Sequence, residues 1–160
     1  MGSVVTIGVY GWSPEHFLEA LRTAGVDQIL DVRQRRGVRG PEYAWGNSAR
    51  LQAALATAGI EYRHHKELAP TTELRHVQYE QDTRQGVGKR SRLELAPEYR
   101  ERYLREILDR VDLGELIRDL PADGLGALLC VERDPESCHR SLIAERLEAE
   151  YAVPVVHLRP

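Results

Sequence analysis

One stretch sets the architecture of this chain: Leu125-Gly126-Ala127-Leu128-Leu129-Cys130-Val131-Glu132-Arg133-Asp134-Pro135-Glu136-Ser137-Cys138-His139-Arg140. Its first part, Leu125 to Val131, is an apolar run typical of a buried strand. A charged turn with a proline follows, and an amphipathic segment from about Ser137 to Tyr151 predicts a helix. Both cysteines of the protein therefore lie at or just past the end of a strand, together with a histidine and two arginines.

The rest of the chain alternates in the same way between apolar strands and amphipathic helices. Strands are predicted at 4–9, 28–32, 60–64, 125–131 and 153–158, and helices at 13–24, 47–58, 97–111, 113–120 and 137–151. Strand, helix and strand in succession form the unit of a parallel sheet with right-handed crossovers. We therefore expect residues 1–160 to form one α/β domain with three α/β/α layers and a mostly parallel, Rossmann-like sheet.

Residues 67–96 do not follow this alternation. They are polar and rich in arginine, with turns at Pro70-Thr71-Thr72 and Gly86-Val87-Gly88 and a short helix expected at Leu74 to Thr83. We interpret this segment as an insertion or lid over the strand ends.

Bulk composition excludes several classes of protein. A length of 160 residues suits one domain whose core needs neither disulfide nor metal. No apolar stretch approaches the roughly 20 residues of a membrane span and no leader pattern begins the chain, so a cytoplasmic location without a membrane partner is expected. The two cysteines, eight residues apart, form neither a secreted framework nor a zinc pattern, and they lack the C-x-x-C spacing of a redox pair. We therefore assign no metal ligand and no cofactor and favour two unconnected cysteines over a Cys130–Cys138 redox pair, while the sequence does not predict whether a metal is bound.

The distribution of basic residues is more informative than the net charge of −3, which does not favour general attraction to nucleic acid. A genome rich in G and C explains why most basic residues are arginines, but it does not explain why they cluster. One cluster is Arg33, Arg35, Arg36 and Arg39, and the other is Arg84, Lys89, Arg90 and Arg92. Apart from Arg33, the first cluster lies in the irregular loop 34–47, which also carries Tyr43 and Trp45. Two roles are equally reasonable for this loop: phosphate contacts with base stacking, or a solvated loop with Trp45 in the core.

Polar side chains follow two of the predicted strands, at the edge where open α/β sheets bind ligands. Asp31 and Arg33 end the second strand, where they form either a ligand-binding pair or a mutual ion pair. Cys138 and His139 begin the helix after the fourth strand, and a helix N-terminus binds anions and favours a thiolate. We expect Arg140 to bind an anion together with Arg33. The alternative is that Arg140 forms an ion pair with a carboxylate such as Glu132 or Asp31.

Several of these motifs resemble the bacterial "domain of unknown function 488" family, over essentially the whole chain. The motifs are Thr6-Ile7-Gly8, Asp31-Val32-Arg33, the arginine-rich loop to Pro41 and Asn47, Glu61-Tyr62, Glu67-Leu68, Tyr99 to Tyr103, Leu129-Cys130-Val131-Glu132 and Cys138-His139-Arg140. The resemblance supports the α/β fold, and it implies no activity because the family is defined without one. The chain departs from the family pattern at Gly8-Val9-Tyr10-Gly11 and at Leu68-Ala69, both near the expected site.

Three functions are consistent with these features. The first is an enzyme acting on a nucleotide, nucleic acid or other phosphorylated or anionic substrate. Its catalytic residues would be Cys138, His139 and Glu132, and its ligand-binding residues Asp31, Arg33, Arg35, Arg36 and Arg140. The second is a non-catalytic nucleic-acid-binding module that uses the Arg33–Arg39 loop and the cluster from Arg84 to Arg92, and the third is an interaction subunit. We favour the first, because folding alone does not explain so many polar residues at the strand ends. The sequence does not predict the oligomeric state.

Overall fold

A five-stranded parallel sheet lies at the centre of the computed structural model, which describes residues 2–160. Its strands are β1 (Ser3–Ile7), β2 (Gln28–Asp31), β3 (Glu61–His64), β4 (Leu125–Leu129) and β5 (Val155–His157). Their order is β3-β2-β4-β1-β5, and all four pairings are parallel. The expected α/β domain with a parallel sheet is confirmed.

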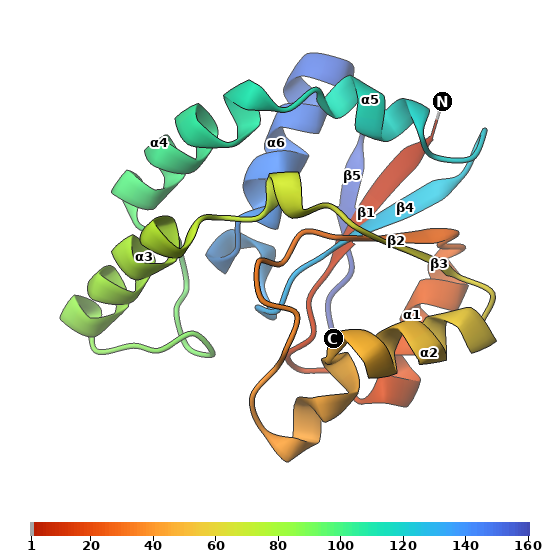
Figure 1. The fold of residues 1–160 in the computed structure, drawn as a ribbon, viewed down its shortest axis with the longest axis horizontal. Coiled ribbons are helices and arrows are strands. Elements are labelled where there is room, and N and C mark those ends of the chain that lie inside the picture. The colour runs from red at the N-terminus through yellow and green to blue at the C-terminus, as the bar shows by residue number, and fades with distance from the viewer. Residues whose placement is uncertain (1) are drawn as a thin grey trace.

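Helices cover both faces of the sheet (Figure 1). On one face lie α1 (Pro14–Ala24) and α2 (Ser48–Thr57), and on the other lie α3 (Thr72–Gln85), α4 (Pro97–Glu106), α5 (Leu113–Arg118) and α6 (Arg140–Tyr151). Four short 3-10 turns connect them, at Pro41–Gly46, Lys66–Leu68, Leu108–Arg110 and Pro135–Ser137. Strand alternation divides the core, because Ile29 packs with the α1 and α2 side chains whereas its neighbour Leu30 packs with those of α3 to α6.

The helix ends follow from local side-chain chemistry. Ser13 caps α1 by accepting a hydrogen bond from the His16 N–H, and Gly25 ends it in the left-handed conformation. Thr71 and Gly86 do the same for α3, which is longer than the helix expected at Leu74 to Thr83. The apolar pattern of α3 is weak because two of its three buried residues are polar.

The start of α6 corrects the sequence analysis. The helix begins at Arg140 rather than at about Ser137, because Pro135–Ser137 forms a separate 3-10 turn and Cys138 is extended (φ −137°, ψ 149°). Cys138 therefore lies just outside the helix N-terminus. The helix expected at 97–111 likewise ends at Glu106, followed by the 3-10 turn Leu108–Arg110.

Two adjacent strands send their loops to opposite faces of the sheet. The loop after β2 leads to α2, and the loop after β4 leads to α6 on the other face. Such a switch point leaves a crevice at the carboxyl edge of a parallel sheet. No helix of residues 2–160 is long and apolar enough to cross a membrane.

Candidate functional site

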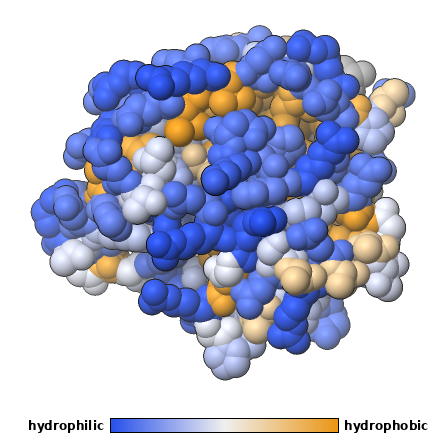
Figure 2. All heavy atoms as spheres, in the orientation of Figure 1, coloured by the Kyte–Doolittle hydropathy of each residue, from blue (hydrophilic) through white to orange (hydrophobic). Residues whose placement is uncertain are grey.

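A cavity of about 740 Å³ lies at this switch point. One wall is the loop after β2, the second is the loop from Cys130 to His139, and the third comes from α3 and the segment that leads to α4. The segment 67–96 thus supplies one wall of the cavity at the strand ends. The face of the molecule drawn in Figure 2 is mostly hydrophilic. The volume is that of a typical small-molecule site.

The cavity is strongly cationic. One carboxylate, Glu132, lines it beside seven basic side chains, namely Arg33, Arg35, Arg39, Arg75, Lys89, Arg90 and Arg92. Within residues 2–160, three of these seven have no carboxylate oxygen within 4.0 Å: Arg35, Arg39 and Arg75. The cavity therefore carries excess positive charge, which attracts anions.

Arg90 holds two walls of the cavity together. Its guanidinium lies over the rings of Tyr10 and Tyr43, 4.9 and 5.1 Å from their centroids. It also donates hydrogen bonds to the Glu42 carboxylate (3.0 Å) and to the Arg39 carbonyl (3.1 Å). The chain between α3 and α4 is thereby fastened to the loop after β2, with cation–π contacts adding to the ion pair.

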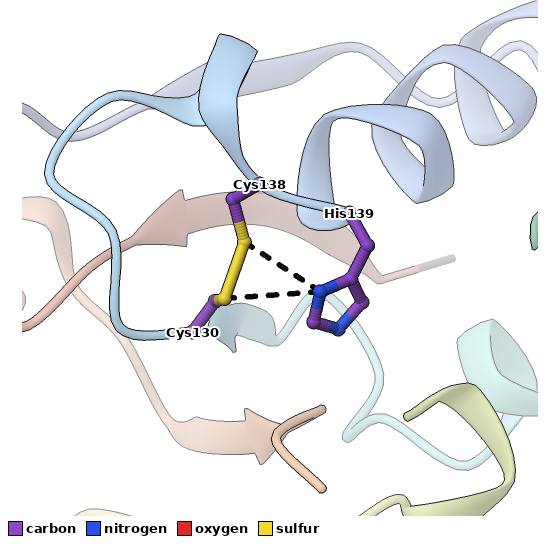
Figure 3. Close-up of side chains that lie close together, drawn as sticks. All are labelled: Cys130, Cys138 and His139. Atoms are coloured by element: carbon purple, nitrogen blue, oxygen red, sulfur yellow. Dashed lines mark hydrogen bonds between the residues drawn. A yellow bond between two sulfur atoms is a disulfide. The ribbon is translucent and has the colours of Figure 1, made fainter. Parts of the chain in front are cut away.

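The two cysteines meet at the cavity wall and are joined by a disulfide (Figure 3). This corrects the expectation of two unconnected cysteines. The spacing argument failed because the 3-10 turn at Pro135–Ser137 brings Cys138 back against the end of β4, so that residues eight apart in sequence are neighbours in space. His139 points its Nδ1 at both sulfurs, 3.8 Å from Cys130 Sγ and 3.7 Å from Cys138 Sγ.

The protonation of His139 follows from its contacts. Its Nε2 lies 2.8 Å from the Val32 carbonyl, which can only accept, so Nε2 carries the proton and Nδ1 presents a lone pair to the sulfurs. Burial lowers the pKa of His139 to about 4, so the ring is neutral at pH 7. His139 therefore presents a free Nδ1 lone pair to the two sulfurs, available to a metal ion or to a thiol hydrogen bond.

Glu132 is a buried carboxylate that stays ionised. Burial alone would raise its pKa, but Lys89 and Arg92 hold the pKa below its ordinary value. Its Oε1 lies 3.4 Å from Arg92 Nη1 and 4.0 Å from Lys89 Nζ, while its Oε2 lies 2.8 Å from Cys130 Sγ. The carboxylate thus joins the cationic wall to the sulfur pair.

Asp31 and Arg33 form the mutual ion pair that the sequence left as an alternative. Arg33 donates from Nε and Nη2 to the two carboxylate oxygens of Asp31, at 2.9 and 2.8 Å, and from Nη1 to the Gly46 carbonyl at 2.8 Å. Both side chains are buried. Arg33 lines the cavity, but these bonds occupy its guanidinium and fix the loop after β2.

Arg140 also has a structural task. It is fully buried and donates to the carbonyls of Glu132 (2.8 Å) and Arg133 (3.1 Å), and to Thr6 Oγ1 (3.3 Å). It does not line the cavity, so the geometry does not assemble the anion site expected from Arg33 and Arg140 together. The absence of a side chain at Gly8 makes room for the Glu132 carbonyl that Arg140 binds, because a Cβ at Gly8 would overlap that carbonyl.

The remaining basic residues divide between the cavity and the surface. Arg35 lines the cavity, whereas Arg36 lies outside it and bonds the Tyr62 hydroxyl. The sequence analysis assigned no role to Arg75, and it gave Lys89 and Arg92 a role only in the nucleic-acid-binding alternative, through the charge cluster at 84–92.

The two aromatic side chains of the loop after β2 are packed against the protein. Trp45 lies against Phe17, with ring centroids 4.9 Å apart, and Tyr43 lies against Tyr10 at 5.0 Å. Their rings are therefore engaged rather than splayed out for base stacking.

Comparison with known proteins assigns the chain to a family but to no activity. No curated protein and no solved structure matches it. A family model described as "Domain of unknown function DUF488" matches residues 13–147, a range that includes both cysteines, His139 and every residue that lines the cavity except Tyr10. The expected resemblance is thus confirmed, and the chain belongs to the DUF488 family.

Proposed function

We propose that this protein is an enzyme that binds a phosphorylated or otherwise multiply anionic small molecule, such as a nucleotide, and acts on it with the Cys138 thiol. One observation carries the proposal: the cationic cavity and the Cys-His cluster share a wall. Arg35, Arg39, Arg75 and Lys89 would bind the anionic group, since guanidinium and ammonium groups pair well with phosphate.

The chemical step requires the reduced form of the cysteine pair. As the Cys138 sulfur forms a bond to an electrophilic carbon or phosphorus of the substrate, the thiol proton passes to His139 Nδ1, 3.7 Å away. The bond to the leaving group breaks, and His139 passes the proton on to that group. A water molecule then cleaves the bond between the substrate and Cys138, and one of its protons restores the thiol. The proposal includes a cytoplasmic location, because a reducing compartment keeps the pair as thiols.

Nucleic-acid binding through the Arg33–Arg39 loop is the weaker alternative. Arg33 is occupied by Asp31 and Gly46, and both loop aromatics are packed inward. The cavity volume of about 740 Å³ suits a mononucleotide-sized ligand rather than a duplex.

A thermal-shift series tests the binding step. Pyrophosphate, mononucleotides and sugar phosphates are added to the reduced protein and to the variants Arg39→Ala and Lys89→Ala. Arg63→Ala is the matched control, because Arg63 is an exposed arginine outside the cavity. A ligand at about 100 times its Kd adds roughly 2.7 kcal/mol, or about 5–10 °C in Tm for a chain of this size.

We expect at least one class of anion to stabilise the wild type and Arg63→Ala but not the two cavity variants. Products from the stabilising class are then followed by phosphorus NMR with the wild type and with Cys138→Ser. Equal shifts in all variants would refute the anion site. Equal turnover by Cys138→Ser would refute the role of the thiol.

A further inference from the structure

We infer that the reduced protein binds a thiophilic divalent metal ion, such as Zn²⁺, through Cys130 Sγ, Cys138 Sγ and His139 Nδ1. These three donor atoms lie within 4.8 Å of one another, and all three residues are buried. The inference goes beyond the proposed function and does not rest on it. It also differs from the sequence analysis, which predicted no metal ligands because the two cysteines lack zinc-site spacing.

The orientation of His139 is that of a metal ligand. Metal-binding histidines usually donate their second ring N–H to a carbonyl or a carboxylate, which fixes the tautomer and aims the free nitrogen. Here the Nε2–H donates to the Val32 carbonyl, and the Nδ1 lone pair faces two sulfurs (Figure 3). In the disulfide neither sulfur carries a hydrogen, so the Nδ1 lone pair has no donor there. A metal ion held by both thiolates would satisfy it.

The spacing already present fits tetrahedral coordination. With Zn–S near 2.3 Å and Zn–N near 2.1 Å, a tetrahedral site separates nitrogen from sulfur by about 3.6 Å. The observed separations are 3.7 and 3.8 Å. Only the two sulfurs must move apart, and reduction of the disulfide releases them.

Glu132 links the site to the cationic wall but is not one of its three donors, which leaves the fourth coordination position to water or a substrate. Its Oε2 is 2.8 Å from Cys130 Sγ, so the carboxylate lies beside one sulfur of the site and adds its charge to that of the two thiolates. Two thiolates, one carboxylate and a divalent ion sum to one negative charge. Lys89 and Arg92 already lie beside Glu132 and compensate that charge.

The redox state decides whether the metal binds. Binding replaces the two thiol protons with one metal ion, so each metal ion taken up releases two protons to solvent. The disulfide has no thiolate to offer and excludes the ion. The same sulfurs cannot be metal ligands and free nucleophiles at once, so the bound metal also shields Cys138 from alkylation.

Cobalt titration tests the inference directly. The chain is reduced with a phosphine, freed of metal with a chelator and titrated with Co²⁺ under argon. We expect one equivalent of Co²⁺ to give thiolate-to-cobalt charge-transfer absorption with the visible bands of tetrahedral cobalt, and Zn²⁺ to bleach both. The variants Cys138→Ser and His139→Asn should weaken binding by more than about tenfold. His65→Asn is the control, because His65 is a histidine paired with Glu67 away from the cluster.

Three results would overturn the inference, provided that circular dichroism shows a folded chain. They are no charge-transfer band in the reduced wild type, an unchanged spectrum in Cys138→Ser, and equal Co²⁺ uptake by the oxidised protein. Anion binding in the thermal-shift series is measured with chelator present. The two proposals therefore fail independently.

Discussion

Replacement of Arg140 by methionine separates a structural role for this residue from the ligand-binding role that its sequence position indicates. Arg140 is 0 % exposed, and its two short hydrogen bonds go to the carbonyls of Glu132 and Arg133. Methionine fills similar volume but leaves both carbonyls without this donor. The loop that carries Glu132 and leads to Cys138 loses its anchor.

The magnitude follows from those two bonds. Hydrogen bonds to a charged group contribute about 1.5–3 kcal/mol each, which gives about 3–6 kcal/mol for the pair. Burial lowers the pKa of Arg140 to about 10, which shows that desolvation of the guanidinium costs free energy, and the variant regains part of that cost. We therefore expect a net loss of roughly 3 kcal/mol, or a Tm lower by about 6–12 °C.

Urea denaturation and calorimetry measure this loss, with Arg133→Met as the control because Arg133 is the exposed arginine in the same loop. The anion that stabilises the wild type should still stabilise Arg140→Met by the same amount. A loss no greater than that of Arg133→Met would refute the structural role. So would a stable variant that no longer responds to the anion.

Three further predictions concern the pH dependence of stability, the close contact between Gly8 and the Glu132 carbonyl, and the cavity wall that Arg90 holds. His139 has its folded pKa lowered from 6.5 to about 4, so its contribution to stability is complete above pH 6.5 and is lost as the pH falls to 4. The free energy of unfolding, measured by urea titration with chelator present, should fall by roughly 3 kcal/mol more in wild type than in His139→Gln over that range. Gly8→Ala should lower the free energy of unfolding by about 1–3 kcal/mol in the same assay, because the added Cβ displaces the Glu132 carbonyl. Gly88→Ala is the control, since no atom lies near a Cβ added there, and an equal loss in the two variants would contradict this prediction. Arg90→Ala should speed amide exchange in residues 86–95 by about tenfold, because the contacts that fasten this segment lose about 1.4 kcal/mol of stabilisation. Unchanged exchange, measured by mass spectrometry, would show that Arg90 does not hold this wall.

The sequence predicted the architecture because strand and helix periodicity is local information. The runs around Ile29 and Leu128 are apolar enough to mark buried parallel strands, and Ser13, Gly25 and Gly59 mark helix ends. The length of α3 was missed because its buried face includes Gln78 and Asp82, which bond to each other and to partners outside the helix. Because these buried residues are polar, the sequence of α3 lacks the apolar periodicity by which a helix is predicted.

The cavity lies at the edge of the sheet where the sequence predicts a site, whereas the contacts of the arginines there depend on tertiary structure. Nothing local to Arg140 shows that it donates to the backbone of the loop it follows, and nothing local to Arg33 decides between an ion pair and a ligand. The disulfide depends on a 3-10 turn that no spacing rule includes. Lys89 and Arg75 reach the cavity only because the segment 67–96 folds against the strand ends.

The central claim is that a cationic cavity and a reactive Cys138 form one site, and a pair of alkylating reagents tests it most directly. In a Cys130→Ala background, Cys138 is the sole thiol, and its rates of alkylation by anionic iodoacetate and by neutral iodoacetamide are compared in the folded chain and in urea. A cationic cavity should raise the iodoacetate-to-iodoacetamide rate ratio by about tenfold in the folded chain. The excess should shrink in added salt and in Arg39→Ala and Lys89→Ala, but not in Arg63→Ala. A folded-chain ratio equal to that in urea, or one that the cavity substitutions leave unchanged, would contradict the account.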